Sequence, residues 1–487
     1  MLVPLSPSSV KREDDAQEAE HLERPGGLKG FYYNPYTQIS MVALVCFTCP
    51  GLYNALLGLG GAGRIDPNIN DDANAALYAT FAFFAFFAGS VNNVLGPRLT
   101  LFLGTTGYAL GLGSYLAMNI HPNVGGFVIA AGAYEGLCAA LLWTAEGCLM
   151  LAYPTESQKG TFIGVFWAIF NMGGVVGACV SLGQNFNSTA NSVGNSTYIA
   201  LLVLNICGVL LPLCLADPNK MVRADGTRVK TPRQPTWKSE FRGLWIALKT
   251  DPLVIMLFPM FFASIWYYTW QFNDYNGTLF NIRTRSLNNL VYWLAQIFGS
   301  LIVGSILDWT RLTRRTRAYI GWIILLCLVF FVHGWAYIYQ RGFTRESIAA
   351  TPTRMDIYDH GYAGRILLYT LCGVLDSVWQ TTTYWILGTM SNDAAKLAYF
   401  TGFYKSIQAA GCAGAFATDA VKLPYINIFA STWTLLVAGL IFTLPMIYLR
   451  VKNHTEPSDE LNMDGSEFAS ADKDKKSDVV EQTVNAV

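Results

Sequence analysis

The stretch Gly89-Ser-Val-Asn-Asn93-Val-Leu-Gly96-Pro-Arg98 lies between two long apolar runs of the chain. A second stretch, Gly304-Ser-Ile-Leu-Asp308-Trp-Thr-Arg311, repeats its frame, also between two apolar runs. In each copy a glycine is followed four residues later by a polar side chain, and an arginine closes the turn. A loop that occurs twice between apolar segments predicts a duplicated bundle whose halves move against each other.

The apolar runs identify the class of protein. Of 487 residues, 52% are hydrophobic and 14% are charged, and the apolar residues form blocks long enough to cross a bilayer, for which a helix needs about 20 residues. Because lipid leaves backbone polar groups without water, such blocks must be helical. We therefore predict an all-α polytopic membrane protein with twelve transmembrane helices, at 38–62, 74–95, 99–120, 124–152, 159–183, 197–216, 252–272, 288–308, 317–339, 363–389, 395–418 and 426–449.

The distribution of lysine and arginine predicts the orientation. The two tails and the even-to-odd loops carry 24 of the 33 basic residues, the opposite loops carry 8, and Lys405 lies inside a span. Basic residues accumulate on the cytoplasmic side, so both termini are expected there. The sequons at Asn187, Asn195 and Asn276 fall on the outer side, where glycosylation takes place. This pattern fits the plasma membrane and a vacuolar or endosomal membrane equally well.

The chain contains an internal repeat. Gly136 and Glu156 recur 237 residues later as Gly373 and Asp393, whereas the two loops lie 215 residues apart. An insertion of 22 residues, at about 340–362, reconciles the two offsets. We expect a cytoplasmic tail, a six-helix bundle, a cytoplasmic linker, a second bundle and a disordered cytoplasmic tail, at 1–37, 38–216, 217–251, 252–449 and 450–487.

Two six-helix halves in parallel repeat are typical of the major facilitator fold, and the duplicated loop resembles the signature of that superfamily. Gly89, Gly96 and Arg98 match the signature, but Asn93 stands where it has aspartate. In the second copy the matching residues are Gly304 and Asp308, followed by Arg311. The resemblance implies that the acid accepts hydrogen bonds from a neighbouring helix terminus and pairs with arginine, which latches the cytoplasmic side. Because Asn93 carries no charge, we expect the first latch to be the weaker one.

A more specific resemblance rests on two blocks, Tyr153-Pro-Thr-Glu-Ser-Gln-Lys-Gly160 continuing to Asn171, and Phe262-Ala-Ser-Ile-Trp-Tyr-Tyr-Thr-Trp-Gln271 continuing to Gly277. Both are similar to the UNC-ninety-three-like branch of the major facilitators, and the tails are similar to those of a fungal member. The resemblance implies the fold but leaves the activity open. Relatives in this branch include channel regulators and a receptor-trafficking chaperone.

Asp376 and Lys405 are the first candidates for a functional site, because ionisable groups inside a bilayer are costly unless they are paired or wetted. Asp376 lies near the middle of the tenth helix, and Lys405 lies at similar depth in the eleventh. We predict an ion pair between them, or a carboxylate whose proton Lys405 modulates, with Gln380 beside it. The alternative is a static buried pair that locks the two helices.

Glu135 and Glu146 are the next candidates. They lie eleven residues apart in the fourth helix, about three turns, so both project from one helical face. With Leu142 they form a stripe that would suit a cation or proton path. The alternative is that Glu135 simply reaches water at the outer mouth.

Gln271 and Asp274, with Asn273 and Asn276, end the seventh helix on the outer side. They either gate the pathway or cap helix ends.

Other function classes lack sequence support. No nucleophile triad, phosphate-binding glycine loop or metal-ligand cluster is recognisable outside the spans, so we expect no enzyme activity, no cofactor and no metal. The net charge of zero gives no support for nucleic-acid binding. We predict a secondary transporter in a lipid bilayer that moves a small solute or ion, with a non-transporting regulator or chaperone of a membrane-protein partner as the alternative.

Overall fold

The computed structural model describes residues 26–60, 67–187, 193–223, 225–227, 229, 237–351 and 353–454. The expected disordered tail, from residue 455 onward, lies outside the described residues, as do residues 1–25 and 230–236. Almost every described segment is helical, and the structure records one isolated bridge, between Phe280 and Met355.

The first half begins with a short helix and continues with six crossing segments. The first crossing is interrupted by a π-helical turn, η1, that contains Pro50, because proline cannot donate the backbone hydrogen bond of a regular helix. The elements are α1 (Gly27–Tyr32), α2 (Pro35–Cys46), η1 (Phe47–Gly51), α3 (Leu52–Leu57), α4 (Pro67–Leu95), α5 (Pro97–Ile120), α6 (Gly125–Ala152), α7 (Lys159–Asn185), α8 (Asn195–Val209) and η3 (Leu211–Cys214).

The second half follows η4 (Pro218–Lys220) and the amphipathic helix α9 (Trp237–Thr250). Its first crossing consists of η5 (Pro252–Leu257), α10 (Phe258–Ala263) and η6 (Thr269–Gly277). The remaining elements are α11 (Ile282–Leu307), α12 (Arg314–Gln340), α13 (Arg345–Ala350), α14 (Tyr362–Gly388), α15 (Ala394–Ala420) and α16 (Tyr425–Arg450).

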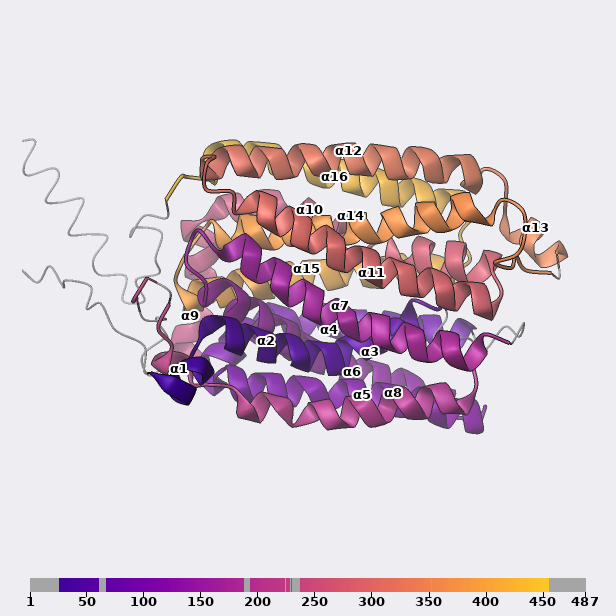
Figure 1. Ribbon diagram of the computed structural model, residues 1–487, viewed down its shortest axis with the longest axis horizontal. Coiled ribbons are helices and arrows are strands. Elements are labelled where there is room, and N and C mark those ends of the chain that lie inside the picture. Colours follow the sequence, from indigo (N-terminus) through magenta and orange to yellow (C-terminus); the bar gives the residue numbers. More distant parts are fainter. Residues whose placement is uncertain are drawn as a thin grey trace, which may run out of the picture.

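The twelve crossings confirm the predicted fold class. Eight of the described segments are long and apolar enough to span a membrane by length and composition alone, and α5, α14 and α15 add helices of similar length. The two halves lie side by side, with α1 and the end of α16 at one end of the molecule and α13 at the other (Figure 1). We call these ends the terminal face and the α13 face. Helix α13 lies within the predicted insertion between the ninth and tenth crossings.

The seventh crossing is not the continuous helix predicted at 252–272. It passes from a 3-10 turn into the six-residue α10 and then into the π-helix η6, which extends to Gly277. Pro252 and Pro259 remove backbone donors near the starts of the first two pieces. Irregular helix at this depth is tolerated where other helices bury it, and π-helical turns are frequent at functional sites.

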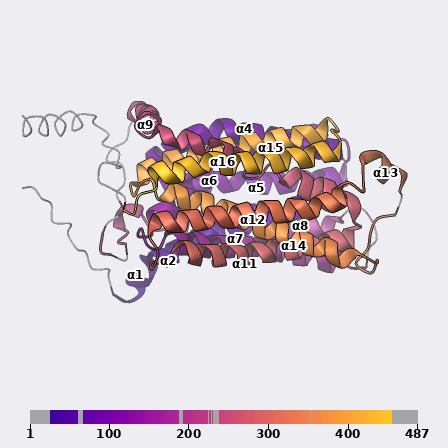
Figure 2. The same ribbon diagram turned by 90° about the horizontal axis from the view of Figure 1, so that it is seen from above.

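The halves meet along two seams, α4 with α15 and α7 with α11 (Figure 2). Both seams depend on glycine at the duplicated loop. A Cβ added to Gly89 would lie 2.8 Å from the carbonyl oxygen of Ala398, and one added to Gly304 would lie 2.5 Å from that of Gly160. The first glycine of each loop copy therefore lets two helix backbones touch.

Candidate functional site

Asp376 lies at the centre of the second half and accepts five hydrogen bonds. Four donors come from the seventh crossing and α11: Tyr267 at 2.7 Å, Tyr268 at 3.1 Å, Tyr292 at 2.9 Å and Gln296 at 2.8 Å. The fifth is Gln380, one turn along α14, at 2.7 Å. All five belong to the same half, so this buried carboxylate ties three helical segments into one body.

The predicted ion pair between Asp376 and Lys405 is not formed. The Lys405 ammonium donates instead to Gln408 on its own helix, at 2.9 Å. It also lies over the rings of Trp143, Tyr404 and Tyr384, at 4.6, 4.9 and 5.1 Å from their centroids. Equal depth in two helices did not bring the side chains together, because the donors around Asp376 already satisfy its oxygens. Aromatic faces attract a cation by their quadrupole and compensate part of its desolvation.

Lys405 joins the two halves through this aromatic box. Trp143 belongs to α6 in the first half, whereas Tyr384 and Tyr404 belong to the second. Glu146, one turn beyond Trp143, accepts a hydrogen bond from Tyr384 at 3.3 Å, and its other oxygen has no partner in the described structure. The charges of Glu146 and Lys405 are close enough to interact electrostatically.

Glu135 is buried in α6, and neither of its carboxylate oxygens has a hydrogen-bond partner in the described structure. A Cβ at Gly111 of α5 would lie 2.0 Å from one of them, so only glycine leaves room for this side chain. A buried polar group without a partner is costly. Among the described carboxylates, Glu135 is the one whose two oxygens are both buried without a hydrogen-bond partner, so it needs a proton or a cation.

The predicted stripe of Glu135, Leu142 and Glu146 does not face one wet path. Leu142 packs against Gly104 of α5, and Glu146 contacts α14 in the other half. Helix α6 contacts α5 at one point along its length and α14 at another, so the environment of a single helical face changes along the helix.

A cavity of about 60 Å³ lies at the junction of the halves. Glu135, Lys405 and Gln408 are among its polar lining, and Gln380 connects it to Asp376. The remaining lining is mainly aromatic: Tyr53, Tyr78, Phe81, Tyr108, Trp143, Trp167, Phe170 and Tyr268. The cavity is far smaller than the roughly 300–1,000 Å³ of sites for drug-sized ligands, and fits water or a small ion.

The α13 face is closed above this cavity by contacts between the halves. The guanidinium of Arg285, itself buried, donates to the carbonyls of Leu59 at 2.6 Å and Gly60 at 2.7 Å. Asn289 donates to Ala55 at 2.7 Å. Gly60 has a φ of +78° and lies against Gly277, so this contact requires glycine.

The polar end of the seventh crossing takes part in the same closure. The side-chain oxygen of Gln271 lies 2.9 Å from the hydroxyl of Tyr292, whose single proton it shares with Asp376. Asn273 donates to Asp419 at 3.1 Å and to Asp71 of the first half at 3.4 Å, while Asp274 is buried beside them with one oxygen unpartnered. The contact of Asn273 with Asp71 joins the two halves, whereas the contacts of Gln271 with Tyr292 and of Asn273 with Asp419 lie within the second half. The gating and capping interpretations therefore both stay predictions.

Asn276 does not present a glycosylation site. Its side chain is fully buried and donates to the carbonyls of Gly58 at 3.0 Å and Arg285 at 3.3 Å. The sequon is buried because η6 carries the seventh crossing to Gly277, beyond the predicted end. Asn187 and Asn195 are exposed near the α13 face.

The second copy of the duplicated loop holds the terminal face closed. Asp308 accepts from the backbone amides of Gly160 at 2.8 Å and Thr161 at 2.5 Å, the first turn of α7. Arg311 is exposed and does not form the latch as predicted; Arg314 instead pairs with Glu156 at 2.9 Å. The arginine that pairs across the seam is therefore three residues after the predicted one. Arg314 is the first residue of α12, and from there its side chain reaches Glu156.

Two further residues of this closure escaped the sequence analysis. Lys159 is buried and donates to the carbonyls of Gly388 and Ser391 and to the side chain of Asn392, which caps the end of α14. Arg223, in the linker, bonds Ala152 at 2.9 Å and the Asn392 carbonyl at 3.1 Å. The repeat offset of 237 residues makes Lys396 the counterpart of Lys159, but it does not indicate the partners of Lys159.

Comparisons with known proteins agree with this architecture. Residues 62–443 match the family model described as "Ion channel regulatory protein UNC-93". An UNC93-like protein of Schizosaccharomyces pombe is 45% identical over 89% of this chain and 86% of its own length, and UNC93-like protein 1 of Arabidopsis thaliana is 36% identical over 87% and 92%. The fucose:proton symporter of E. coli superposes with a TM-score of 0.56 at 13% identity, covering 86% of this chain and all of that one.

Proposed function

The chain belongs to the UNC-93 family and has the major facilitator fold, and from this premise we propose that it is a secondary transporter of a small solute or ion. One observation carries the proposal: a small cavity lies at the junction of the halves, and Glu135, whose carboxylate has no hydrogen-bond partner in the described structure, is one of its lining residues. A static scaffold gains nothing from burying such a group, since leaving a buried carboxylate unpaired destabilises the fold.

Alternating access follows from the two closures. Opening the terminal face requires loss of the contacts of Asp308, Lys159 and Arg314, while opening the α13 face requires loss of those of Arg285 and Asn289. Both sets of contacts are present in the structure, as an occluded state of a transporter requires. Glu135 would bind the transported or coupling cation, and Glu146 with Lys405 would adjust the charge of the cavity as the halves rock.

The orientation and the membrane are part of the proposal. The basic residues support placing the terminal face in the cytoplasm, in the plasma membrane or a vacuolar or endosomal membrane. Asn195 tests the orientation, since it is exposed near the α13 face. Removal of N-glycans should increase the mobility of the expressed protein but not that of an Asn195→Gln, Asn187→Gln variant; a mobility change that persists in this variant would contradict it.

Transport is best tested in proteoliposomes. Charge movement and tracer flux are measured for Na⁺, K⁺ and choline, and charge movement is also measured under an H⁺ gradient. The wild type is compared with Glu135→Gln and Glu346→Gln. Glu346 is an exposed carboxylate of α13 and provides a matched control. We expect Glu135→Gln to reduce flux at least tenfold and Glu346→Gln to leave it unchanged. Equal flux in Glu135→Gln and the wild type would remove the assigned role of Glu135.

A regulatory role is the second candidate, and the small size of the cavity favours it, since about 60 Å³ excludes an organic solute in this state. In this case the protein would bind a membrane channel and move nothing itself. Absence of flux for every tested ion, together with co-purification of a channel whose current changes on removal of this protein, would establish the second candidate and overturn the first.

A further inference from the structure

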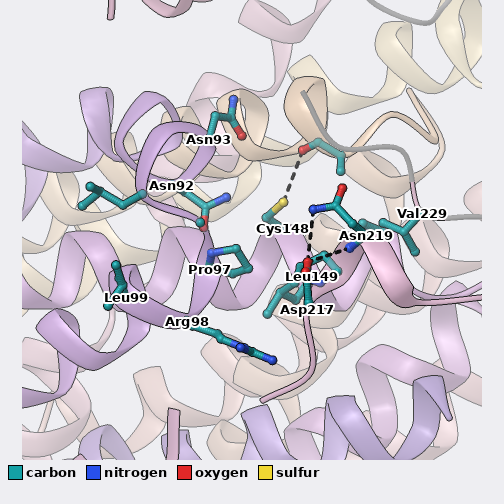
Figure 3. Close-up of a pocket in the computed structure, with 15 residues that line it drawn as sticks. Asn92, Asn93, Pro97, Arg98, Leu99, Cys148, Leu149, Asp217, Asn219 and Val229 are labelled. Carbon is teal, nitrogen blue, oxygen red and sulfur yellow. Dashed lines mark hydrogen bonds between the residues drawn. The ribbon is translucent and has the colours of Figure 1, made fainter. Parts of the chain in front are cut away.

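A second and larger cavity, of about 320 Å³, lies at the terminal face, away from the central cavity. It is lined by the turn between α4 and α5, the end of α6, the linker after η3 and the first residue of α15. In Figure 3, Asn92, Pro97 and Leu99 lie on one side, Asn219 and Val229 on the other, with Cys148 and Leu149 between them. Its volume reaches the range of small-molecule sites.

The chemistry of this cavity is that of an amphiphile site. Most of its wall is apolar, with leucine, proline, alanine and valine side chains. Leu95 and Leu99, at its rim, are 38% and 50% exposed. They extend the apolar wall to the surface of the helix bundle.

Arg98 supplies the polar end of the site. This guanidinium forms no ion pair or hydrogen bond within the described structure, and its buried Nε is unpartnered. Arg98 lies in the first turn of α5, whose preceding residue, Gly96, contributes no capping side chain. A helix N-terminus without a cap favours negative charge, and the guanidinium adds a full positive charge to it.

The loop explains why this arginine is unpaired. In the superfamily signature the arginine has an aspartate five residues earlier as its counter-charge, whereas this chain has the neutral Asn93. Asp217, the carboxylate that lines the same cavity, is engaged by the amide and side chain of Asn219 at 3.0 and 3.1 Å. The cavity therefore contains a guanidinium that forms no ion pair in the described structure, a carboxylate that Asn219 engages, and an apolar wall.

We propose that this cavity binds an amphiphile with an anionic head group, whose negative charge takes the place of the acid that Asn93 lacks. The head group pairs with Arg98 at the start of α5, and the apolar chain lies against Leu149 and Val229. Because Ala394 of α15 also lines the cavity and accepts a bond from Cys148 at 3.2 Å, the ligand contacts both halves. Its binding stabilises the closed terminal face.

Cys148 provides the readout, since its thiol lines the cavity. The full-length protein in phosphatidylcholine nanodiscs is alkylated with a maleimide, and the rate at Cys148 is followed by peptide-resolved mass spectrometry. Dodecanoate is the probe, with dodecanol, acetate and inorganic phosphate as controls. A second set of nanodiscs contains phosphatidylserine and no additive, which distinguishes a diffusible amphiphile from a membrane lipid.

We expect saturable protection of at least fivefold by dodecanoate, by phosphatidylserine, or by both, and none by dodecanol, acetate or phosphate. Arg98→Gln should abolish the protection and Arg98→Lys should retain it. Arg311→Gln, the exposed arginine of the other loop copy, should behave as the wild type. Equal protection by dodecanol, by acetate or by phosphate, protection that persists in Arg98→Gln, or its absence with both amphiphiles would each overturn the proposal. The unfolding midpoint of each variant without ligand verifies that it is folded.

Discussion

Each copy of the duplicated loop lies next to the start of a helix of the other half, α7 or α15. The residue that accepts hydrogen bonds from the first amides of that helix differs between the two copies. In the second copy, Asp308 reaches across the seam and binds the first amides of α7, whose own preceding residue, Gln158, makes no capping bond. In the first copy, α15 is capped by its own Asp393, which accepts from the Lys396 amide at 2.8 Å. Asp393 is the repeat counterpart of Glu156, and Glu156 instead pairs with Arg314.

This difference shows where the closure resides. A helix start needs an acceptor for its free amides, but that acceptor can lie on the same helix or on a neighbour. When it lies on the helix itself, it adds nothing to the contact between halves. The seam of α7 and α11 is therefore fastened by a charged side chain, whereas the cap of α15 by Asp393 adds nothing to the seam of α4 and α15.

Of the changes that test this difference between the two halves, Lys159→Met should cause the largest loss of stability. The change removes a buried ammonium that donates to two carbonyls and one side chain of the other half. Hydrogen bonds to charged groups are worth about 1.5–3 kcal/mol, so we expect a loss of about 3 kcal/mol and faster alkylation of Cys148 as the terminal face opens. The repeat counterpart Lys396→Met is the control, because Lys396 pairs with Asp251 at 3.3 Å. Faster alkylation of Cys148 in the control as well would contradict the assignment.

Asp308→Ala should follow, with a loss of about 2 kcal/mol from two charge-assisted bonds to the start of α7. The unfolding midpoint reports the stability, and Cys148 alkylation reports the opening of the terminal face. Asp308→Asn should retain part of the effect because one amide oxygen still accepts. If Asp308→Ala and Asn93→Ala changed both readouts equally, the proposed asymmetry of the latch would be wrong.

Asp393→Ala should cost about 1 kcal/mol, the usual value of a helix N-cap. This removes the local cap of α15, so the loop of the first copy becomes the nearest replacement. We expect Asn93→Asp to recover at least half of the loss in the Asp393→Ala background and to change the wild type by less than about 0.5 kcal/mol. The double-mutant cycle measures the coupling; additive effects would show that the first loop cannot replace the cap.

Asn93→Ala should have the smallest effect, below about 0.5 kcal/mol, because the residue lacks the charge that makes the second copy strong. Unfolding midpoints of Asn93→Ala and the wild type, measured in the same detergent, provide the comparison. A loss as large as that of Asp308→Ala would place a second working latch at the first loop.

The fold was predictable because the bilayer leaves so few alternatives. Apolar runs of about twenty residues must be helices, and the repeated loop indicates a division into two six-helix halves without knowledge of any contact. The broken seventh crossing was not predictable from hydropathy, since its aromatic residues score as apolar whether the backbone is α-helical or π-helical. For the same reason the predicted seventh crossing ended too early, so Asn276 was expected in an outer loop, whereas it is buried in η6.

The site was predictable in its residues but not in its pairs. Depth along a helix placed Asp376 and Lys405 at the same level, yet the direction of each side chain depends on helix rotation, which tyrosines and glutamines from three segments decide. Glu135 was identified as a candidate, but the sequence does not show that its oxygens lack donors. Lys159 was missed because a lysine near a helix start is ordinarily exposed, and its burial depends on the other half.

The two glycine seams also limit how the surface between the halves can change. At Gly89 and Gly304 one backbone lies directly on another, with no side chains to interlock. Helices whose backbones touch in this way can tilt over one another without first separating interdigitated side chains. A single methyl group at either position would push the two backbones apart and hinder this tilt. Tolerance to substitution at these two seams should therefore measure mobility of the halves more directly than it measures stability.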